Sequence, residues 1–372
     1  MLSPAVPGDR SGTHVYATLD GLRGIAAALI AIRHAGPLFP GWEFPHSPLA
    51  VDLFFVISGF VIASAYDRRL ENGLTPMGFM KLRLIRLYPL YLAGLLLGLA
   101  AGMLCWLTGT DPRLSAATLM GPFLVGLLIL PSPFTWNNET FPLNPPAWSL
   151  FFELAINYIY AVAYRRVTKA RLIGATCIFG ALLLIMSLND MGLDEGHSWP
   201  HFSTGFVRVV FSFSAGLLLF RIRRRVNISS SGSVLVIGLA GATLAMPNLG
   251  QWYSLVAITL WIPVLVFFAT MVEPGARVRR ACLLLGQISY PLYVLHSPAA
   301  VIVESALARV GVVHPNAVIG VIFLGSMMVI ALWTDRFIKA LIGDRFRGER
   351  RMQSSRPDIG GSPAVTTSNA LQ

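Results

Sequence analysis

Long apolar segments alternate with short polar loops over most of the chain. About ten of these segments are close to the roughly 20 residues that a helix needs to cross a bilayer. The pattern predicts an all-α fold, a polytopic bundle of about 10 spanning helices. The predicted spans are 19–36, 49–66, 85–107, 147–164, 172–188, 204–220, 232–247, 252–272, 281–304 and 317–335.

Lysine and arginine are concentrated in every second loop, whereas the opposite loops carry only Arg113 and Arg309. By the positive-inside rule, the basic loops and both termini lie in the cytoplasm. The basic loops hold Arg68, Arg69, Lys81, Arg83 and Arg86; then Arg165, Arg166, Lys169 and Arg171; then Arg221, Arg223, Arg224 and Arg225; then Arg277, Arg279 and Arg280.

An eleventh apolar stretch, 114–131, does not fit this alternation. The polar segments on both its sides are nearly free of Lys and Arg, so a full crossing would place one of them on the basic side. We therefore predict a re-entrant or interfacial segment. The Pro- and Asn-rich segment 132–146 would then lie outside, either as a lid or acceptor-binding loop or as a plain connector.

Composition supports a bilayer protein and excludes several other classes. With 55% hydrophobic and only 13% charged residues, the chain is too apolar for a soluble domain. The net charge of +11 follows from loop orientation, so we expect no nucleic-acid partner. The three cysteines lie far apart in apolar runs, which indicates neither a disulfide framework nor a metal site. The predicted organisation is a cytoplasmic N-terminal segment (1–18), a transmembrane domain (19–343) and a disordered cytoplasmic tail (344–372).

The few ionisable residues inside the predicted membrane are candidates for function. Arg23 and His34 are spaced so that they share one face of the first span, about 16 Å apart along its axis. Asp52 begins the second span near the depth of His34, where a carboxylate can orient an imidazole. Both outer residues also have structural explanations, His34 as an interhelical hydrogen-bonding group and Asp52 as a favourable charge at a helix start.

Glu153 lies in the helix predicted for 147–164, with Asn157 and Tyr160 on the same polar face. We expect Glu153 to converge with His34 and Asp52 on an acid–base site in the outer half of the membrane.

At the inner surface, Arg83 and Arg86 share a helix face. They are either orienting charges or receivers for phosphate, which arginine binds through charge-assisted hydrogen bonds. Near the other end of the chain, Ser289, Tyr293 and His296 share a face. They form either acceptor contacts or interhelical hydrogen bonds.

Five linked motifs in this order resemble the acyltransferase 3 family of bacterial membrane acyltransferases, from Leu19 to about Trp333. They are LDGLRG with its following histidine, DLFFVISGF, RLIRLYPLY, WSLFFE and ISYPLYVLH. The resemblance implies that Arg23 and His34 are essential and that Asp52, the pair Arg83 and Arg86, and Glu153 belong to the site. Many members carry a second acidic residue after the WSL glutamate, where this chain has Leu154. The chain is similar to the stand-alone form, without a fused SGNH domain.

The resemblance further implies a multi-pass enzyme of the bacterial cytoplasmic (inner) membrane that acylates, and above all acetylates, sugar hydroxyls. The expected acceptor is an exopolysaccharide, lipopolysaccharide or glycolipid. Acyl-CoA (acetyl-CoA) would be the co-substrate, with no permanently bound cofactor and no metal. His34 would act as general base, held by Asp52 or Glu153, or would form an acyl-histidine. A transporter or flippase for a glycan or acidic substrate is the alternative function, and a non-catalytic scaffold is a third.

Overall fold

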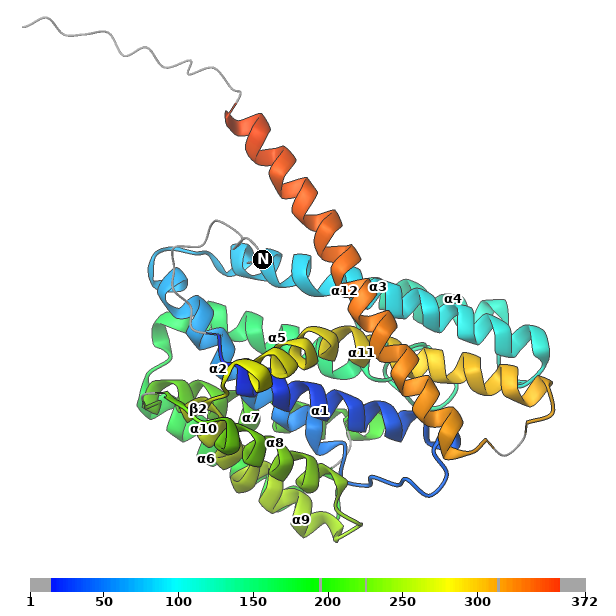
Figure 1. The fold of residues 1–372 in the computed structure, drawn as a ribbon, viewed down its shortest axis with the longest axis horizontal. Coiled ribbons are helices and arrows are strands. Elements are labelled where there is room, and N and C mark those ends of the chain that lie inside the picture. Colours follow the sequence, from blue (N-terminus) through cyan, green and yellow to red (C-terminus); the bar gives the residue numbers. More distant parts are fainter. Residues whose placement is uncertain (1–14, 194–195, 225, 313–314, 355–372) are drawn as a thin grey trace, which may run out of the picture.

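A computed structural model describes residues 15–354 except 194–195, 225 and 313–314, and it describes side chains as far as Ala340. The described chain is almost entirely helical (Figure 1), which confirms the predicted all-α class. The α-helices are α1 (Ala17–His34), α2 (Leu49–Glu71), α3 (Pro76–Thr108), α4 (Ala116–Gly126), α5 (Ala147–Ala163), α6 (Lys169–Leu188), α7 (Phe202–Ile222), α8 (Ser230–Ala245), α9 (Gly250–Val256), α10 (Ile262–Met271), α11 (Ala276–Arg309) and α12 (Ala317–Ser354). Short 3₁₀ turns cover Gly36–Leu38, Tyr164–Arg166 and Trp199–His201, and a π-helix, Ala257–Trp261, joins α9 to α10.

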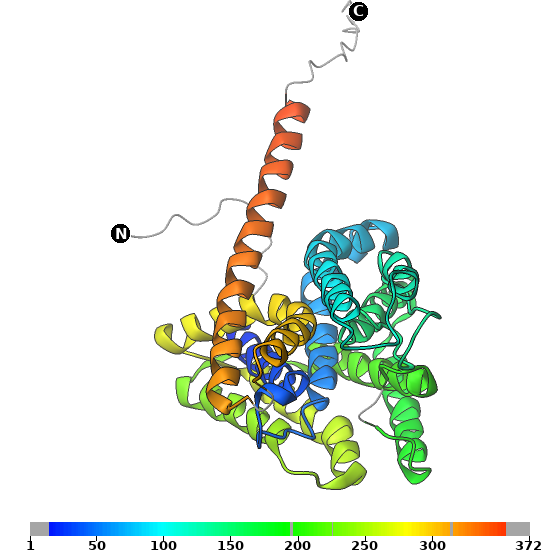
Figure 2. The same ribbon diagram turned by 90° about the vertical axis from the view of Figure 1, so that its right-hand side faces the viewer.

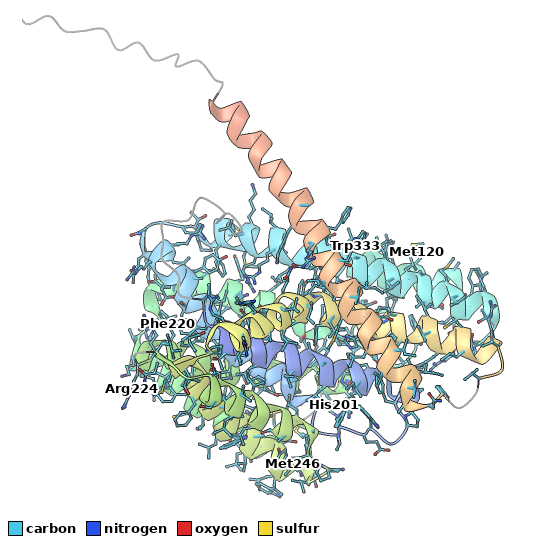
Figure 3. All side chains as sticks on the ribbon, in the orientation of Figure 1. Met120, His201, Phe220, Arg224, Met246 and Trp333 are labelled. Atoms are coloured by element: carbon cyan, nitrogen blue, oxygen red, sulfur yellow. The ribbon has the colours of Figure 1, made fainter. Side chains whose placement is uncertain are left out.

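Each predicted span coincides with a helix. Within the described residues, 7 helices are long and apolar enough to cross a membrane. They are α2, α3, α6, α7 with its preceding turn, the run from α9 to α10, α11, and α12 as far as Ala340. The other predicted spans correspond to α1, α5 and α8, which are shorter or carry charges. Exposed apolar side chains such as Met120, Met246 and Trp333 lie on the outside of the bundle (Figure 3), as on a lipid-facing surface.

The stretch 114–131 forms only the 11-residue helix α4, which begins at a capping box of Ser115 and Thr118. A helix of this length rises about 16 Å, about half of a hydrocarbon core, so α4 alone cannot span the bilayer. The segment therefore has the short form expected for a re-entrant or interfacial helix.

Two boundaries differ from the sequence prediction. Helix α3 begins at Pro76, before the predicted span 85–107, because Thr75 caps it by accepting a hydrogen bond from the Gly78 N–H at 3.1 Å. Helix α12 continues to Ser354 and extends beyond the rest of the bundle (Figures 1 and 2), so residues 344–354 are helical rather than disordered. This part of the sequence contains four arginines together with Glu349, Met352 and Gln353, all of them residue types that favour helix. The rest of the predicted tail, 355–372, and residues 1–14 lie outside the described residues.

Two close-packed helix pairs organise the core. In α1 and α11, which run parallel, a Cβ on Gly24 would lie 2.4 Å from the Leu285 Cβ. In α2 and α7, also parallel, a Cβ on Gly59 would lie 2.3 Å from the Phe213 carbonyl oxygen. The missing side chains let these backbones approach closely and so fix which residues of each pair lie opposite one another.

A two-stranded parallel sheet holds the start of α1. Strand β1 (Asn227–Ile228) pairs with β2 (Val272–Glu273). The Ala17 N–H donates to the Glu273 carboxylate at 3.0 Å, and the Thr18 hydroxyl donates to the Val272 carbonyl at 2.6 Å. The helix that carries Arg23 and His34 is thereby anchored at its N-terminal end.

Candidate functional site

One cavity lies between α1, α2, α3, α5 and α11 and contains about 890 Å³ of empty space, part of it open to solvent. Six of the candidate residues identified from the sequence line this cavity. The fold thus brings together residues that lie far apart in the chain. They are Arg23, Arg83, Arg86, Glu153, Ser289 and Tyr293. The lining residues of α2 run from Val51 to Ile62, a rise of about 16 Å. The cavity therefore extends along α2 for about half of the roughly 30 Å thickness of a hydrocarbon core.

Three arginines give the cavity a basic wall. Arg83 is only 6% exposed and forms an ion pair with Glu153, which also accepts a hydrogen bond from Ser58 at 3.1 Å. Arg86, one turn further along α3, is exposed, and Arg23 lies 3.6 Å from the Asp20 carboxylate. Arg86 and Arg23 thus keep more donor capacity for an anionic ligand than Arg83 does.

The burial of Arg83 differs from the sequence prediction, which placed it at the inner surface. Because α3 begins at Pro76, Arg83 lies two turns inside this helix and reaches Glu153 in the bundle interior. Glu153 accordingly neutralises an arginine and does not hold His34.

His34 lies at the C-terminal end of α1, is exposed, and pairs with another histidine. Its Nδ1 lies 2.8 Å from Nε2 of His296, whose side chain is 0% exposed. The ring planes are inclined by 26° with centroids 5.0 Å apart, so the nitrogens lie between nearly coplanar rings. This is the geometry of an N–H···N hydrogen bond rather than of stacking.

His34 does not belong to the lining of the cavity among the described residues. His296 connects the two regions, since its ring lies 6.0 Å from that of Tyr293. The Tyr293 hydroxyl in turn contacts the Ser149 hydroxyl at 2.8 Å and donates to the Pro146 carbonyl at 3.1 Å. The cavity therefore ends one aromatic ring away from the histidine pair.

Asp52 does not converge on His34 either. It forms a buried ion pair with Arg208 of α7, both side chains being 0% exposed, and the Arg208 Nε donates to Asp52 at 3.2 Å. Ser212 donates to the same carboxylate at 3.4 Å, and Arg208 also donates to the Pro48 carbonyl at 3.2 Å. The sequence gives the position of Asp52 along its helix. It does not give the rotation of this helix about its axis, which turns Asp52 toward α7.

Arg208 is a residue that the sequence reasoning missed, although a single arginine within the apolar run FVRVVFSF was a usable signal.

Three other candidate residues form side-chain hydrogen bonds away from the histidine pair or none at all within the described residues. Asn157 is buried, and neither of its amide atoms has a hydrogen-bond partner among the described residues, whereas Tyr160 donates to Asp67. The Ser289 hydroxyl donates to the Gly286 carbonyl of its own helix at 2.8 Å.

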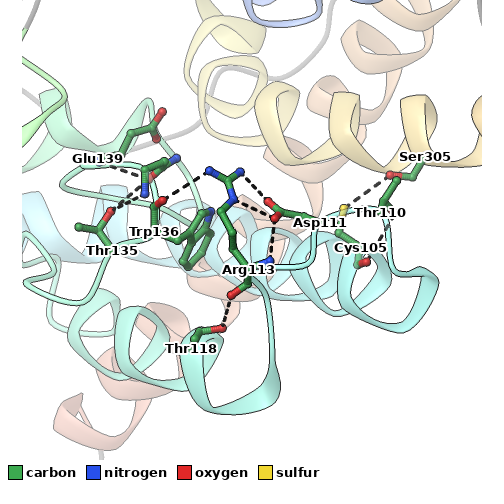
Figure 4. Close-up of polar contacts among 10 residues, drawn as sticks. Cys105, Thr110, Asp111, Arg113, Thr118, Thr135, Trp136, Glu139 and Ser305 are labelled. Carbon is green, nitrogen blue, oxygen red and sulfur yellow. Dashed lines mark hydrogen bonds and ion pairs between the residues drawn. The ribbon is translucent and has the colours of Figure 1, made fainter.

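The segment 132–146 packs against residues 197–201. The Thr140 N–H donates to the His197 carbonyl at 2.8 Å, and the Trp199 N–H donates to the Asn138 carbonyl at 2.9 Å. In Figure 4, Arg113 bridges Asp111 and the Trp136 carbonyl, and its hydrogen bonds lower the pKa of Asp111. Burial raises the pKa of Glu139 to about 7. The segment 132–146 is thus held by hydrogen bonds to residues 197–201 and to Arg113.

The described residues contain no group of three or more His, Cys, Asp or Glu side chains placed to hold a metal ion. The ionisable groups that the structure places in and beside the cavity are arginines, carboxylates and the two histidines.

Comparison with known proteins gives the class. A family described as an acyltransferase domain matches residues 16–336, so the chain belongs to the acyltransferase 3 family. It is 40% identical to Protein 2 in the picA locus of Rhizobium radiobacter over 46% of this chain and 93% of that protein. It is 26% identical to the exopolysaccharide production protein ExoZ of Rhizobium meliloti over 79% of this chain and 89% of that protein. BcsY of Komagataeibacter xylinus, whose name describes a membrane-bound transacylase, is 26% identical over 84% and 79%. No solved structure matches the chain.

The family match and the apolar helices define a multi-pass membrane acyltransferase.

Proposed function

We propose that this protein is an O-acyltransferase that moves an acyl group, in the first place acetyl, from cytoplasmic acyl-CoA to a hydroxyl of a cell-surface or exported glycan. The observation that carries the proposal is the cavity that joins a wall of three arginines to the neighbourhood of the histidine pair. A donor with phosphates at one end and a thioester at the other suits a cavity with a basic wall at one end. The printed name of ExoZ, an exopolysaccharide production protein, favours an exopolysaccharide acceptor.

In this proposal, Arg86 and Arg23 bind the phosphates of the donor, and the pantetheine arm extends along α2 toward Tyr293. His34 takes the proton of the acceptor hydroxyl while the hydroxyl oxygen attacks the thioester carbonyl. The carbon–sulfur bond then breaks, and the CoA thiolate takes the proton from His34. The products are an O-acyl ester and CoA with a free thiol.

Donor binding tests the proposal at Arg86, because this arginine is exposed and its loss leaves no buried charge unpaired. Hydrogen bonds to charged groups contribute about 1.5–3 kcal/mol, so Arg86→Ala should weaken acetyl-CoA binding by roughly 10- to 100-fold. The first measurement is equilibrium binding of acetyl-CoA to the protein in lipid nanodiscs. The second is the rate at which the bound acyl group is released from CoA. Arg280→Ala is the matched control, since Arg280 is exposed on α11 and does not line the cavity.

Equal losses of affinity in both variants would indicate general electrostatic attraction, and an unchanged affinity in Arg86→Ala would return Arg86 to the role of an orienting charge. Arg86→Lys should recover the affinity only in part, because an ammonium lacks the planar fork of a guanidinium.

The orientation is tested by single cysteines on a background without the three native ones. We expect Asn72→Cys to be labelled from the cytoplasm and Asn137→Cys from the opposite side, because both positions are exposed and the basic loops face inward. The reverse result would place the arginine wall away from cytoplasmic acyl-CoA. The acceptor is identified by comparing cell-surface glycans, by mass and NMR, with and without the protein.

A further inference from the structure

We propose that His296 is a positioning residue that sets the tautomer of His34, so that Nε2 of His34 is the nitrogen that takes the proton of the acceptor hydroxyl. The inference rests on the proposed function and adds to it the atom that acts as base and the group that orients it. Its physical basis is a chain of hydrogen bonds from a backbone carbonyl through two imidazoles.

The first link fixes the proton on His296. Its Nδ1 lies 2.9 Å from the carbonyl oxygen of Leu292, one turn earlier in α11. A carbonyl oxygen only accepts hydrogen bonds, so Nδ1 of His296 carries the proton. In a neutral imidazole, the other nitrogen, Nε2, then has the free lone pair.

The second link transfers this constraint to His34. Its Nδ1 lies 2.8 Å from Nε2 of His296, which is an acceptor, so Nδ1 of His34 must be the donor. The lone pair of a neutral His34 is therefore on Nε2. Because His34 is exposed at the end of α1, this nitrogen is accessible to a hydroxyl group.

Burial keeps the arrangement from reversing. His296 is 0% exposed, and a positive charge on a fully buried imidazole carries a large desolvation cost. When His34 takes a proton, the charge stays on the exposed ring, and its Nδ1–H makes a charge-assisted bond to the neutral His296. His296 thus occupies the place that the sequence reasoning gave to Asp52 or Glu153.

The helix packing supplies the required precision. Gly24 brings α1 against Leu285, and a Cβ on Gly286 would lie 2.4 Å from the Asp20 Cβ. These close approaches set the register of α1 against α11, which brings His34 level with His296 at the far end of the pair. The positioning group is therefore part of the rigid core and not of a loop.

Two replacements of His296 separate positioning from packing. Glutamine can place an amide oxygen near the position of Nε2 and accept from His34, whereas leucine has comparable size and no acceptor. We expect His296→Leu to lower kcat by about 10²-fold or more, with little change in KM for acetyl-CoA, because the active tautomer is no longer enforced. His296→Gln should recover kcat to within about tenfold of the natural protein. His201→Gln is the control for a histidine outside the site, and it should leave kcat unchanged.

A spectroscopic measurement reports the tautomer directly. In protein labelled with ¹⁵N-histidine, the signals of His34 are identified by their loss in His34→Gln, and we expect its proton on Nδ1. In His296→Leu the proton should shift toward Nε2. A natural protein with His34 protonated on Nε2, or a His296→Leu variant with unchanged kcat, would overturn the inference.

The same assays distinguish this failure from failure of the proposed function. If His34→Gln is inactive while His296→Leu is fully active, His34 remains the base and the positioning role of His296 is wrong. If His34→Gln keeps transferring the acyl group, the base lies elsewhere, and both the catalytic proposal and the inference built on it fall. Thermal unfolding of each variant in detergent is measured alongside, and His296→Gln still tests the inference if His296→Leu does not fold.

Discussion

The two parallel helix pairs of the core carry very different polar contacts at corresponding ends. Between α1 and α11, an exposed histidine meets a buried one, and both can be neutral. Between α2 and α7, Asp52 and Arg208 form an ion pair with both side chains 0% exposed. The first pair leaves a ring nitrogen accessible, while the second is sealed from solvent.

The difference shows that an ionisable residue inside a membrane bundle is not by itself a reactive group. Asp52 accepts from Arg208 and Ser212, so its carboxylate is used in joining α2 to α7. The Arg208 guanidinium also lies 5.7 Å from the ring centre of Trp148. A satisfied charge of this kind holds helices together, whereas His34 combines exposure with an orienting partner.

The largest expected effect is at His34. His34→Gln can form a hydrogen bond but cannot take up a proton, so acyl transfer should fall by about 10²–10⁴-fold, the usual contribution of a general base. Insertion and acetyl-CoA affinity should remain, because the donor binds at the arginine wall. The measurement combines steady-state transfer to purified glycan with equilibrium donor binding.

The matched comparison alters the buried ion pair of Asp52 and Arg208 and measures stability. Breaking a buried ion pair costs about 3–5 kcal/mol, so Asp52→Ala should strongly lower the free energy of unfolding. Replacing both partners, Asp52→Leu with Arg208→Met, should regain most of it, because neither charge is then left alone. Unfolding in mixed micelles measures this.

Activity of the stable double variant decides between the two explanations of Asp52. Transfer near the natural rate would make Asp52 a structural residue. A folded double variant that has lost transfer would instead show that the carboxylate takes part in the reaction.

The sequence predicted the all-α class and the positions of the helices well because hydropathy is a local property. The sequence also grouped Arg23, Arg83 and Arg86 as donor-binding candidates, and the structure places all three in the lining of one cavity. The partners of the acidic residues could not be predicted, since they depend on how each helix is rotated against its neighbours. Asp52 and Glu153 each pair with an arginine, on α7 and α3 respectively.

The role of His296 was left open because its partner lies on a neighbouring helix. Spacing placed it on a polar face with Ser289 and Tyr293 but gave no information on the helix opposite. Its contact with His34 depends on the glycines of α1 and α11, and a single glycine in an apolar run does not identify its neighbour.

A smaller effect on the free energy of unfolding is expected at Glu153, because its ion pair with Arg83 is less buried than that of Asp52 with Arg208. Glu153→Gln should lower the free energy of unfolding by about 1–3 kcal/mol, since the buried Arg83 loses its counter-charge. Donor affinity should not fall, because Arg83 becomes available to phosphate. Transfer within a few-fold of the natural rate is expected if Glu153 only neutralises Arg83.

Steady-state kinetics and donor binding on Glu153→Gln test both statements. A loss of transfer of about 10²-fold with intact binding would make Glu153 part of the catalytic chemistry, which is the role the sequence favoured. Ser58→Ala, which removes only a hydrogen bond to the same carboxylate, is the matched control.

The smallest effect concerns Glu139, a partly buried carboxylate whose pKa is not affected by any cation of the described residues. Burial raises the pKa of Glu139 to about 7, and its Oε2 has no hydrogen-bond partner within the part of the chain that the structure describes. A carboxyl whose pKa is raised on folding binds more protons in the folded state, so its contribution to stability is present below about pH 4.5 and is lost as pH rises toward 7. Glu139→Gln removes this dependence, so the variant should gain stability relative to the natural protein between pH 5 and pH 8. The gain should be on the order of 1 kcal/mol, about one pKa unit, since partial exposure screens the charge. The difference between the two unfolding curves isolates Glu139 from the histidines, and a difference that does not change with pH would contradict the prediction.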